Sequence, residues 1–182
     1  MVTTTSAGID ALPHELRRRV GTIWAERART ELGAGSGFAQ VVVGLYALGA
    51  RAEVLALATR AAGEEVAHAQ SCRRLAELYL GKPVAMPRAK RVSMPAHPGA
   101  NEPLRATLHV IGLSCLNETI AADFVARCLD ASEVPEVRDA CTTHLRDEIG
   151  HARVGWAHLA SGALDARDRR VLAPWMARLV RA

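Results

Sequence analysis

Two segments of identical spacing constrain this chain most: Glu65-x-x-His68 and Glu148-x-x-His151. Each lies inside a long stretch with helical character. Side chains three residues apart on a helix point in the same direction, so the Glu and His of one segment can bind the same metal ion. A bundle that brings both segments together would therefore hold most of the ligands for a pair of metal ions.

Two further carboxylates complete the pattern expected of a carboxylate-bridged dinuclear site. The candidates are Glu31 and Glu118, each on a different long helical stretch. At a rise of about 1.5 Å per residue, Glu31 lies within about one turn of Glu65 in depth, counted from the connection between their helices. The same count places Glu118 within about one turn of Glu148. Burying four carboxylates in the middle of a bundle without a cation would be very costly, which favours a divalent metal pair.

The rest of the chain predicts a single all-α domain, 1–182. Apolar residues make up 49% of the sequence, yet it has only two Phe and two Tyr and few β-branched runs, which favours helices over strands. Proline and glycine positions set the boundaries. The predicted segments are a flexible N-terminus (1–11), four bundle helices (12–48, 52–80, 103–130 and 133–160), a crossover (81–102) and a C-terminal helix (165–180).

The connections between these helices predict their arrangement. The connections after the first and third bundle helices are short, which indicates two antiparallel hairpins. The proline-rich segment 81–102 is too long for a simple turn and long enough to run the full length of a bundle. We therefore expect a four-helix bundle of two antiparallel hairpins with one long crossover, plus a short C-terminal helix.

A third histidine shares the helix face of the second motif. His144 precedes Glu148 by four residues and His151 by seven. It is either an additional ligand of one metal ion or a polar neighbour one turn away from the site. The sequence leaves both readings open.

The residue before each chelating glutamate is also acidic, namely Glu64 and Asp147. A metal-bound histidine usually donates its other ring N–H to a carboxylate, which fixes its tautomer. We predict a crossed arrangement in which Asp147 orients His68 and Glu64 orients His151. The alternative is that both acidic residues are solvated on the helix flanks.

Small residues near the candidate metal-binding side chains indicate space for O2 and a substrate. Glycines are costly within a helix, by about 1 kcal/mol each, and several follow Glu31 directly. The alternatives are a tight helix–helix contact or a local π-bulge. The predicted pocket residues are Ala34, Gly35, Phe38, Cys115, Ala121 and Ala122.

The cysteines show no CxxC spacing. We interpret Cys72, Cys115 and Cys141, which lie one or two turns from candidate ligands, as small residues that pack in the core. Nothing in the sequence suggests secretion, so reduced thiols and a cytoplasmic location are expected.

Charge and hydropathy argue against two classes of partner. The net charge is +4, but the basic residues are scattered rather than arranged in a stripe with aromatics, so we expect no nucleic-acid partner. The N-terminus lacks the apolar region of a signal peptide. The apolar stretch 38–50 is too short to span a bilayer, so no membrane partner is expected.

Taken together, the motifs resemble the ferritin-like di-iron carboxylate superfamily over residues 12–160. Glu64-Glu65-x-x-His68 and Asp147-Glu148-x-x-His151 look like segments of small bacterial ferritin-like domain proteins. The spacing His144-x3-Glu148-x2-His151 is locally similar to that of p-aminobenzoate N-oxygenases, in which three histidines serve the di-iron site. This chain is shorter than those enzymes.

The resemblance implies two iron ions, or a Mn/Fe pair, with O2 as co-substrate. It implies a di-iron oxidase or oxygenase, an oxidoreductase acting on a small-molecule substrate, with amines as one candidate class. An external electron donor would be needed, and exposed helical faces would allow a homodimer. The first alternative is a ferroxidase or peroxide-detoxifying protein. The second is a non-catalytic, metal-stabilised helical module, which a closed apolar shell around the metal would favour.

Overall fold

The computed structural model describes residues 7–180, and this part of the chain is helical without strands. Its elements are α1 (Ala7–Asp10), α2 (His14–Ala47), α3 (Ala52–Leu80), α4 (Glu102–Val110), the π-helix η1 (Ile111–Asn117), α5 (Glu118–Ala131), α6 (Pro135–Ala160) and α7 (Ala166–Leu179). Because α4, η1 and α5 follow one another without a break, they form one long helix. The prediction of an all-helical bundle is confirmed.

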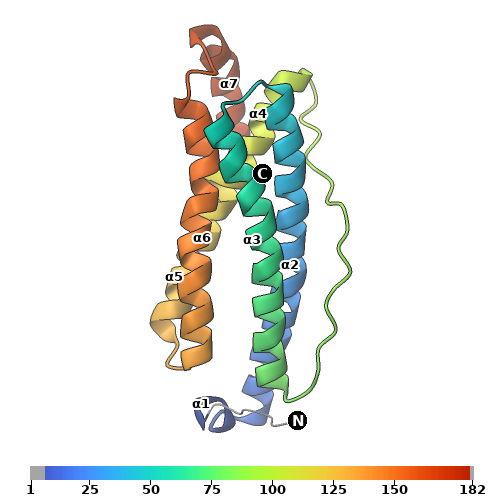
Figure 1. Ribbon diagram of the computed structural model, residues 1–182, viewed down its shortest axis with the longest axis vertical. Helices are drawn as coiled ribbons and strands as arrows, with labels where there is room; N and C mark the ends of the chain where they lie inside the picture. The colour runs from blue at the N-terminus through green and yellow to red at the C-terminus, as the bar shows by residue number, and fades with distance from the viewer. Residues whose placement is uncertain (1–6, 181–182) are drawn as a thin grey trace.

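The long helices lie side by side in a bundle (Figure 1). The helix α2 runs antiparallel to α3, against which it packs, and α5 runs antiparallel to α6. Both α2 and α3 end beside a glycine with positive φ, Gly49 and Gly81, a backbone conformation that ends helices and favours glycine. The extended segment 81–101 then runs along the outside of the first hairpin and returns the chain to the other end of the bundle.

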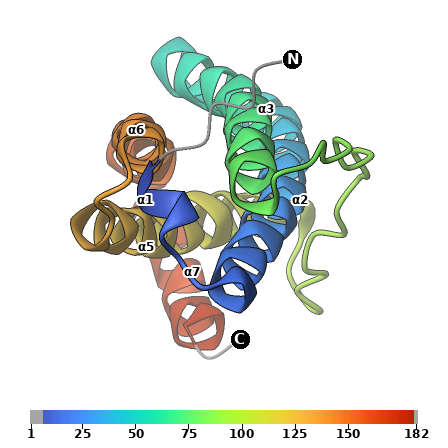
Figure 2. The same cartoon turned by 90° about the horizontal axis from the view of Figure 1, so that it is seen from below.

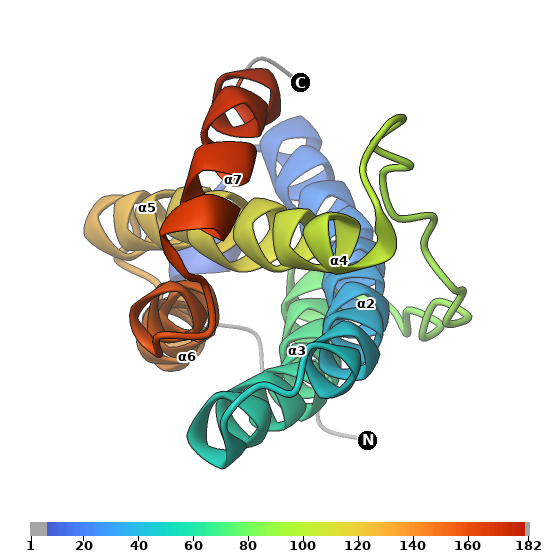
Figure 3. The ribbon, with the colours of Figure 1, turned by 90° about the horizontal axis from the view of Figure 1, so that it is seen from above.

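Two short helices close the ends of the bundle. The view from below shows α1 beneath the long helices (Figure 2), and the view from above shows α7 across the long helix that α4 begins (Figure 3). Leu172, on α7, is buried against Leu108 and Ile111. At the other end, Ile9 of α1 is buried in a cluster with Trp24 and Val137.

The expectation of a flexible segment over 1–11 is wrong for residues 7–10, which form α1. The physical reason is that Ile9 buries all but 1% of its surface in the core. Asp10 also accepts a 3.1 Å ion-pair contact from Arg17. The first six residues lie outside the part of the chain that the structure describes.

The glycines after Glu31 allow close contacts on several sides of α2. A Cβ at Gly35 would lie 3.2 Å from Cβ of Glu65, so this glycine lets α2 approach α3. A Cβ at Gly37 would lie 3.2 Å from Leu113 of η1. The crossover packs here too: the Val92 N–H donates to Ser36 Oγ at 3.1 Å. Tight helix packing therefore explains Gly35, whereas Gly33 and Gly37 also line a cavity. The π-helix occurs in η1, directly before Glu118.

The candidate ligands lie between two apolar clusters. One cluster, around Trp24, Leu75 and Val137, occupies the α1 end of the bundle, and the other, around Phe38 and Val154, occupies the opposite half. Buried polar side chains fill the level between them. All four candidate carboxylates are at most 5% exposed: Glu31, Glu65, Glu118 and Glu148.

The stretch Glu102–Ala131 is long and apolar enough, by length and composition, to cross a membrane. The core helix of a soluble protein passes the same test, so length and composition alone are weak evidence for a membrane-spanning helix. Here the helix packs against α6 and contains the buried carboxylate of Glu118. The expected cytoplasmic location and the absence of a membrane partner stay predictions.

Candidate metal centre

Four buried side chains from α3 and α6 converge in the middle of the bundle. One ligand atom from each of Glu65, His68, Glu148 and His151 lies within 4.8 Å of the others. All four residues are at most 1% exposed. This group could hold a metal ion.

Both imidazoles direct Nδ1 into this group. Nδ1 of His151 lies 3.0 Å from Oε1 of Glu65 and 3.2 Å from Oε2 of Glu148. Nδ1 of His68 lies 3.7 Å from Oε2 of Glu65 and 3.6 Å from Oε1 of Glu148. Each carboxylate therefore has one oxygen near each imidazole, an arrangement suited to a carboxylate shared between two ions.

The opposite nitrogen of each imidazole meets an outer carboxylate on the neighbouring helix. Nε2 of His68 lies 3.2 Å from Asp147, and Nε2 of His151 lies 3.0 Å from Glu64. These are the crossed contacts expected from the sequence. A proton on Nε2 leaves the lone pair of Nδ1 facing the centre, which is the tautomer that a metal ligand needs. That they orient metal ligands stays a prediction.

Glu31 and Glu118 reach the centre from α2 and α5. Burial raises the pKa of Glu31 to about 7, although its ion pair with Arg27 opposes the change. Burial and the neighbouring charge of Glu148 raise the pKa of Glu118 to about 10. Such values are expected where carboxylates are withdrawn from water without sufficient positive charge.

The residues fit a divalent metal pair. Both oxygens of Glu65, Oε1 of Glu148 and Nδ1 of His68 are buried without a hydrogen bond to any described residue. Each unsatisfied buried polar atom costs about 1–3 kcal/mol, so four of them in one place call for a ligand. Carboxylate oxygen and imidazole nitrogen suit iron or manganese.

His144 lies in the same half of the centre as Glu31. Its ring stacks on that of His68, with centroids 4.1 Å apart and planes inclined by 22°. One of its ligand atoms lies within 4.8 Å of Glu31 and Cys72. Burial and the neighbouring His68 lower the pKa of His144 to about 3, so the ring is neutral, as a metal ligand must be.

The sequence interpretation missed Arg27, which forms an ion pair with Glu31 one turn away on α2. The guanidinium also lies over the ring of Phe124, 4.7 Å from its centroid. The four-residue spacing between Arg27 and Glu31 was the available signal, because such pairs meet on a helix surface.

A cavity of about 770 Å³ reaches the centre between α2, the crossover and the helix that contains η1. Glu31 and Glu118 line it, together with apolar side chains such as Val92 and Leu113. Ala34 and Ala121 also line it, as expected from the sequence.

The other four predicted pocket residues do not line this cavity. Gly35 faces α3. Phe38 is fully buried and packs edge-on against His151, with the two ring centroids 5.3 Å apart. Cys115 is buried where η1 passes Gly155, and Ala122 is outside the lining. The assignment of Gly35, Phe38, Cys115 and Ala122 to a pocket stays a prediction.

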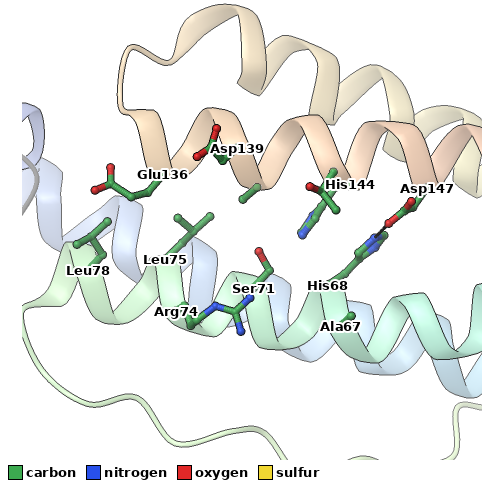
Figure 4. A pocket seen from close by; sticks show the side chains of 12 residues that line it. Ala67, His68, Ser71, Arg74, Leu75, Leu78, Glu136, Asp139, His144 and Asp147 are labelled. Atoms are coloured by element: carbon green, nitrogen blue, oxygen red, sulfur yellow. Dashed lines mark hydrogen bonds and ion pairs between the residues drawn. The ribbon is translucent and has the colours of Figure 1, made fainter. Parts of the chain in front are cut away.

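A second cavity of about 630 Å³ opens between α3 and α6 (Figure 4). His68, His144 and Asp147 form the end nearest the centre. Glu136 and Asp139 line the other end. The centre is thus approached from two sides.

The chain matches no protein-family model, and no curated protein or solved structure is significantly similar to it. The functional interpretation consequently depends on the chain's own residues and their geometry.

Proposed function

We propose that this protein is a ferritin-like di-iron oxidase or oxygenase that uses O2 to oxidise a small molecule. The observation that carries the proposal is the paired orientation of His68 and His151. Each directs Nδ1 toward Glu65 and Glu148 and holds Nε2 against an outer carboxylate. Two antiparallel hairpins with a long crossover support the ferritin-like topology.

The donor set divides naturally between two ions. Glu31 and His68 would hold one ion, and Glu118 and His151 the other. Glu65 and Glu148 would be shared, and His144 would join the Glu31 half. When bound, the iron pair supplies the electrons that reduce O2, and four carboxylates balance the charge of two divalent ions.

The chain's own residues would prepare this chemistry. The outer carboxylates Asp147 and Glu64 hold the ring protons on Nε2. Phe38 covers one side of His151 and excludes water there. The larger cavity would hold the substrate, because its apolar walls exclude water and its inner end is formed by Glu31 and Glu118. An external electron donor is required to return the iron to its reduced state.

The cavities help to rank the alternatives. A non-catalytic, metal-stabilised module needs no access to its metal, whereas two cavities approach this centre. A ferroxidase remains the second candidate, because the smaller cavity is lined by Glu136 and Asp139, carboxylates that suit the passage of Fe(II).

The first experiment is anaerobic loading with Fe(II), removal of free metal and determination of the iron content. We expect two irons per chain in the wild type and a loss of iron in Glu65→Ala and Glu148→Ala. Glu53→Ala, which alters an exposed carboxylate on α3, is the matched control and should keep both irons. A wild-type protein without stoichiometric iron would contradict the metal centre.

The second step separates the two catalytic candidates. O2 consumption by the iron-loaded protein is measured with a chemical reductant, with and without a panel of small molecules that begins with amines. Sustained consumption that depends on one of these compounds and yields an oxidised product supports the oxygenase. Consumption that follows added Fe(II) alone supports the ferroxidase.

A further inference from the structure

A buried thiol lies at the Glu31 half of the centre. One ligand atom from each of Glu31, Cys72 and His144 lies within 4.8 Å of the others. The three residues come from α2, α3 and α6, and their exposed fractions are 5%, 0% and 2%. Cys72 packs in the apolar cluster at the α1 end and also lies beside two candidate ligands.

Two polar atoms around this thiol are unsatisfied. Nε2 of His144 is buried without a hydrogen-bond partner among residues 7–180. Nε of Arg27 is buried and unpartnered within the same range, while the guanidinium pairs with Glu31 and lies beside Cys72. An imidazole nitrogen without a partner, next to a carboxylate and a thiol, is available to coordinate a metal ion.

The charges of the centre also leave room for one more anion. The carboxylates of Glu31, Glu65, Glu118 and Glu148 balance two divalent ions. The outer carboxylates Glu64 and Asp147 have their own cations in Arg60 and Arg146. The charge of Arg27, whose side chain is only 19% exposed, is then unbalanced unless a further anion forms beside it.

The other buried thiols lack these surroundings. Cys141 is 1% exposed and belongs to the same apolar cluster as Cys72. Cys115 lies where η1 meets Gly155. Within the part of the chain that the structure describes, neither belongs to a group of converging metal-ligating side chains.

We propose that Cys72 is a thiolate ligand of the metal ion in the Glu31 half, together with Glu31 and His144. This inference rests on the proposed metal centre. On binding, a sulfur–metal bond forms and the thiol proton leaves to solvent. Carboxylate, imidazole and thiolate together suit thiophilic divalent ions such as Co²⁺ and Zn²⁺, so this half differs chemically from the Glu118 half.

The metal-free protein keeps this group as a thiol. Burial raises the pKa of Cys72 to about 12, with the charge of Glu31 acting in the same direction. A thiol that coordinates a metal ion is deprotonated outright, because the charge of the ion replaces the proton. The guanidinium of Arg27 would then face the new anion.

The test is an anaerobic titration of the chelator-treated, reduced full-length protein with Co²⁺, followed by absorption spectroscopy. A thiolate bound to Co²⁺ produces a sulfur-to-metal charge-transfer band in the near ultraviolet, whereas oxygen and nitrogen ligands contribute only weak visible bands. We expect the charge-transfer band in the wild type and its complete loss in Cys72→Ser. Cys141→Ser, a buried cysteine of the same cluster, should keep the band at full intensity.

The outcomes separate this inference from the proposed function. If Co²⁺ binds stoichiometrically and the wild type shows only the visible bands, the thiolate proposal is overturned and the metal centre stands. A near-ultraviolet band that persists in Cys72→Ser also overturns it. If no Co²⁺ binds, both fall together. The wild-type spectrum decides even if the serine variant does not fold, and Cys72→Ala provides a second variant without a polar atom.

Discussion

Glu118 provides the sharpest test of the centre, because its effect on stability should depend on both pH and metal. In the metal-free protein, burial and the charge of Glu148 raise its pKa from 4.5 to about 10. Between these values the folded protein keeps a proton on Glu118 that the unfolded chain releases. The free energy of unfolding should therefore be unaffected by this group below pH 4.5 and fall as the pH rises above it.

The size of this effect follows from the same shift. From 4.5 to pH 7 the interval is about 2.5 pH units, which corresponds to about 3 kcal/mol. Glu118→Gln keeps the size of the side chain and removes the ionisable proton. We expect the metal-free variant to be more stable than the metal-free wild type by about 3 kcal/mol at pH 7. This corresponds to a melting temperature higher by roughly 6–12 °C in a domain of this size.

Metal should narrow this difference. A ligand present at 100 times its Kd stabilises the folded state by about 2.7 kcal/mol, and the wild type should gain this for each ion that Glu118 helps to hold. The variant lacks one ligand and should gain less. The assay is thermal and urea unfolding at several pH values between 5 and 8, with chelator or with Mn²⁺. Glu53→Gln, at an exposed carboxylate, should follow the wild type throughout.

Two results would refute this reasoning. The first is a metal-free Glu118→Gln variant that is less stable than the wild type at pH 7, which would mean that the carboxylate is ionised and well paired. The second is an equal gain from metal in both proteins, which would remove Glu118 from the ligand set.

Three further changes test other parts of the centre. Asp147→Asn should weaken metal binding by about 10–100-fold in calorimetric titrations while far-ultraviolet circular dichroism stays unchanged, and undiminished affinity would contradict an orienting role. Gly155→Ala should lower the free energy of unfolding by about 1–3 kcal/mol in urea, because its Cβ would lie 2.4 Å from Sγ of Cys115. Ala121→Leu should fill part of the larger cavity and reduce substrate-dependent O2 consumption at unchanged iron content, whereas Ala122→Leu, outside the lining, should not.

Sequence spacing was sufficient to predict the helices and the level of the centre. A helix fixes both the direction and the height of each side chain, so the count from the turns placed Glu31 beside Glu65 and Glu118 beside Glu148 in depth. The structure places all of them in the buried middle of the bundle. The outer contacts of Asp147 and Glu64 were also predictable, because each precedes a chelating residue on a helix that faces the other.

The cavity could not be predicted in the same way. Its walls depend on where the crossover passes α2, and the extended segment 81–101 has no periodicity from which to infer this. Val92 packs along α2 beside Ser36, so Ala34 lies at the cavity while Gly35 is turned toward α3. The proximity of Cys72 to Glu31 could not be predicted either, since it depends on how α2 and α3 are rotated about their axes.

The two motifs are equivalent in sequence but not in their surroundings. On α6, the residue four positions before Glu148 is His144, whereas on α3 the residue four positions before Glu65 is Ala61, which is 1% exposed. A position one turn before the chelating glutamate faces the same interior level on either helix. The second motif therefore has an imidazole one turn before its glutamate, where the first has a methyl group.

The surroundings of the other two carboxylates, Glu31 and Glu118, also differ. Arg27 lies four residues before Glu31, and Ser114 lies four residues before Glu118, within η1. Arg27 places a cation beside the first half, while Ser114, fully buried with its hydroxyl oxygen unpartnered among the described residues, adds none beside the second. A positive charge stabilises an anionic, donor-rich ligand set, and a small neutral neighbour leaves room for an exchangeable ligand. The two halves therefore differ in charge and in the side chains around them, although Glu31 and Glu118 both line the larger cavity.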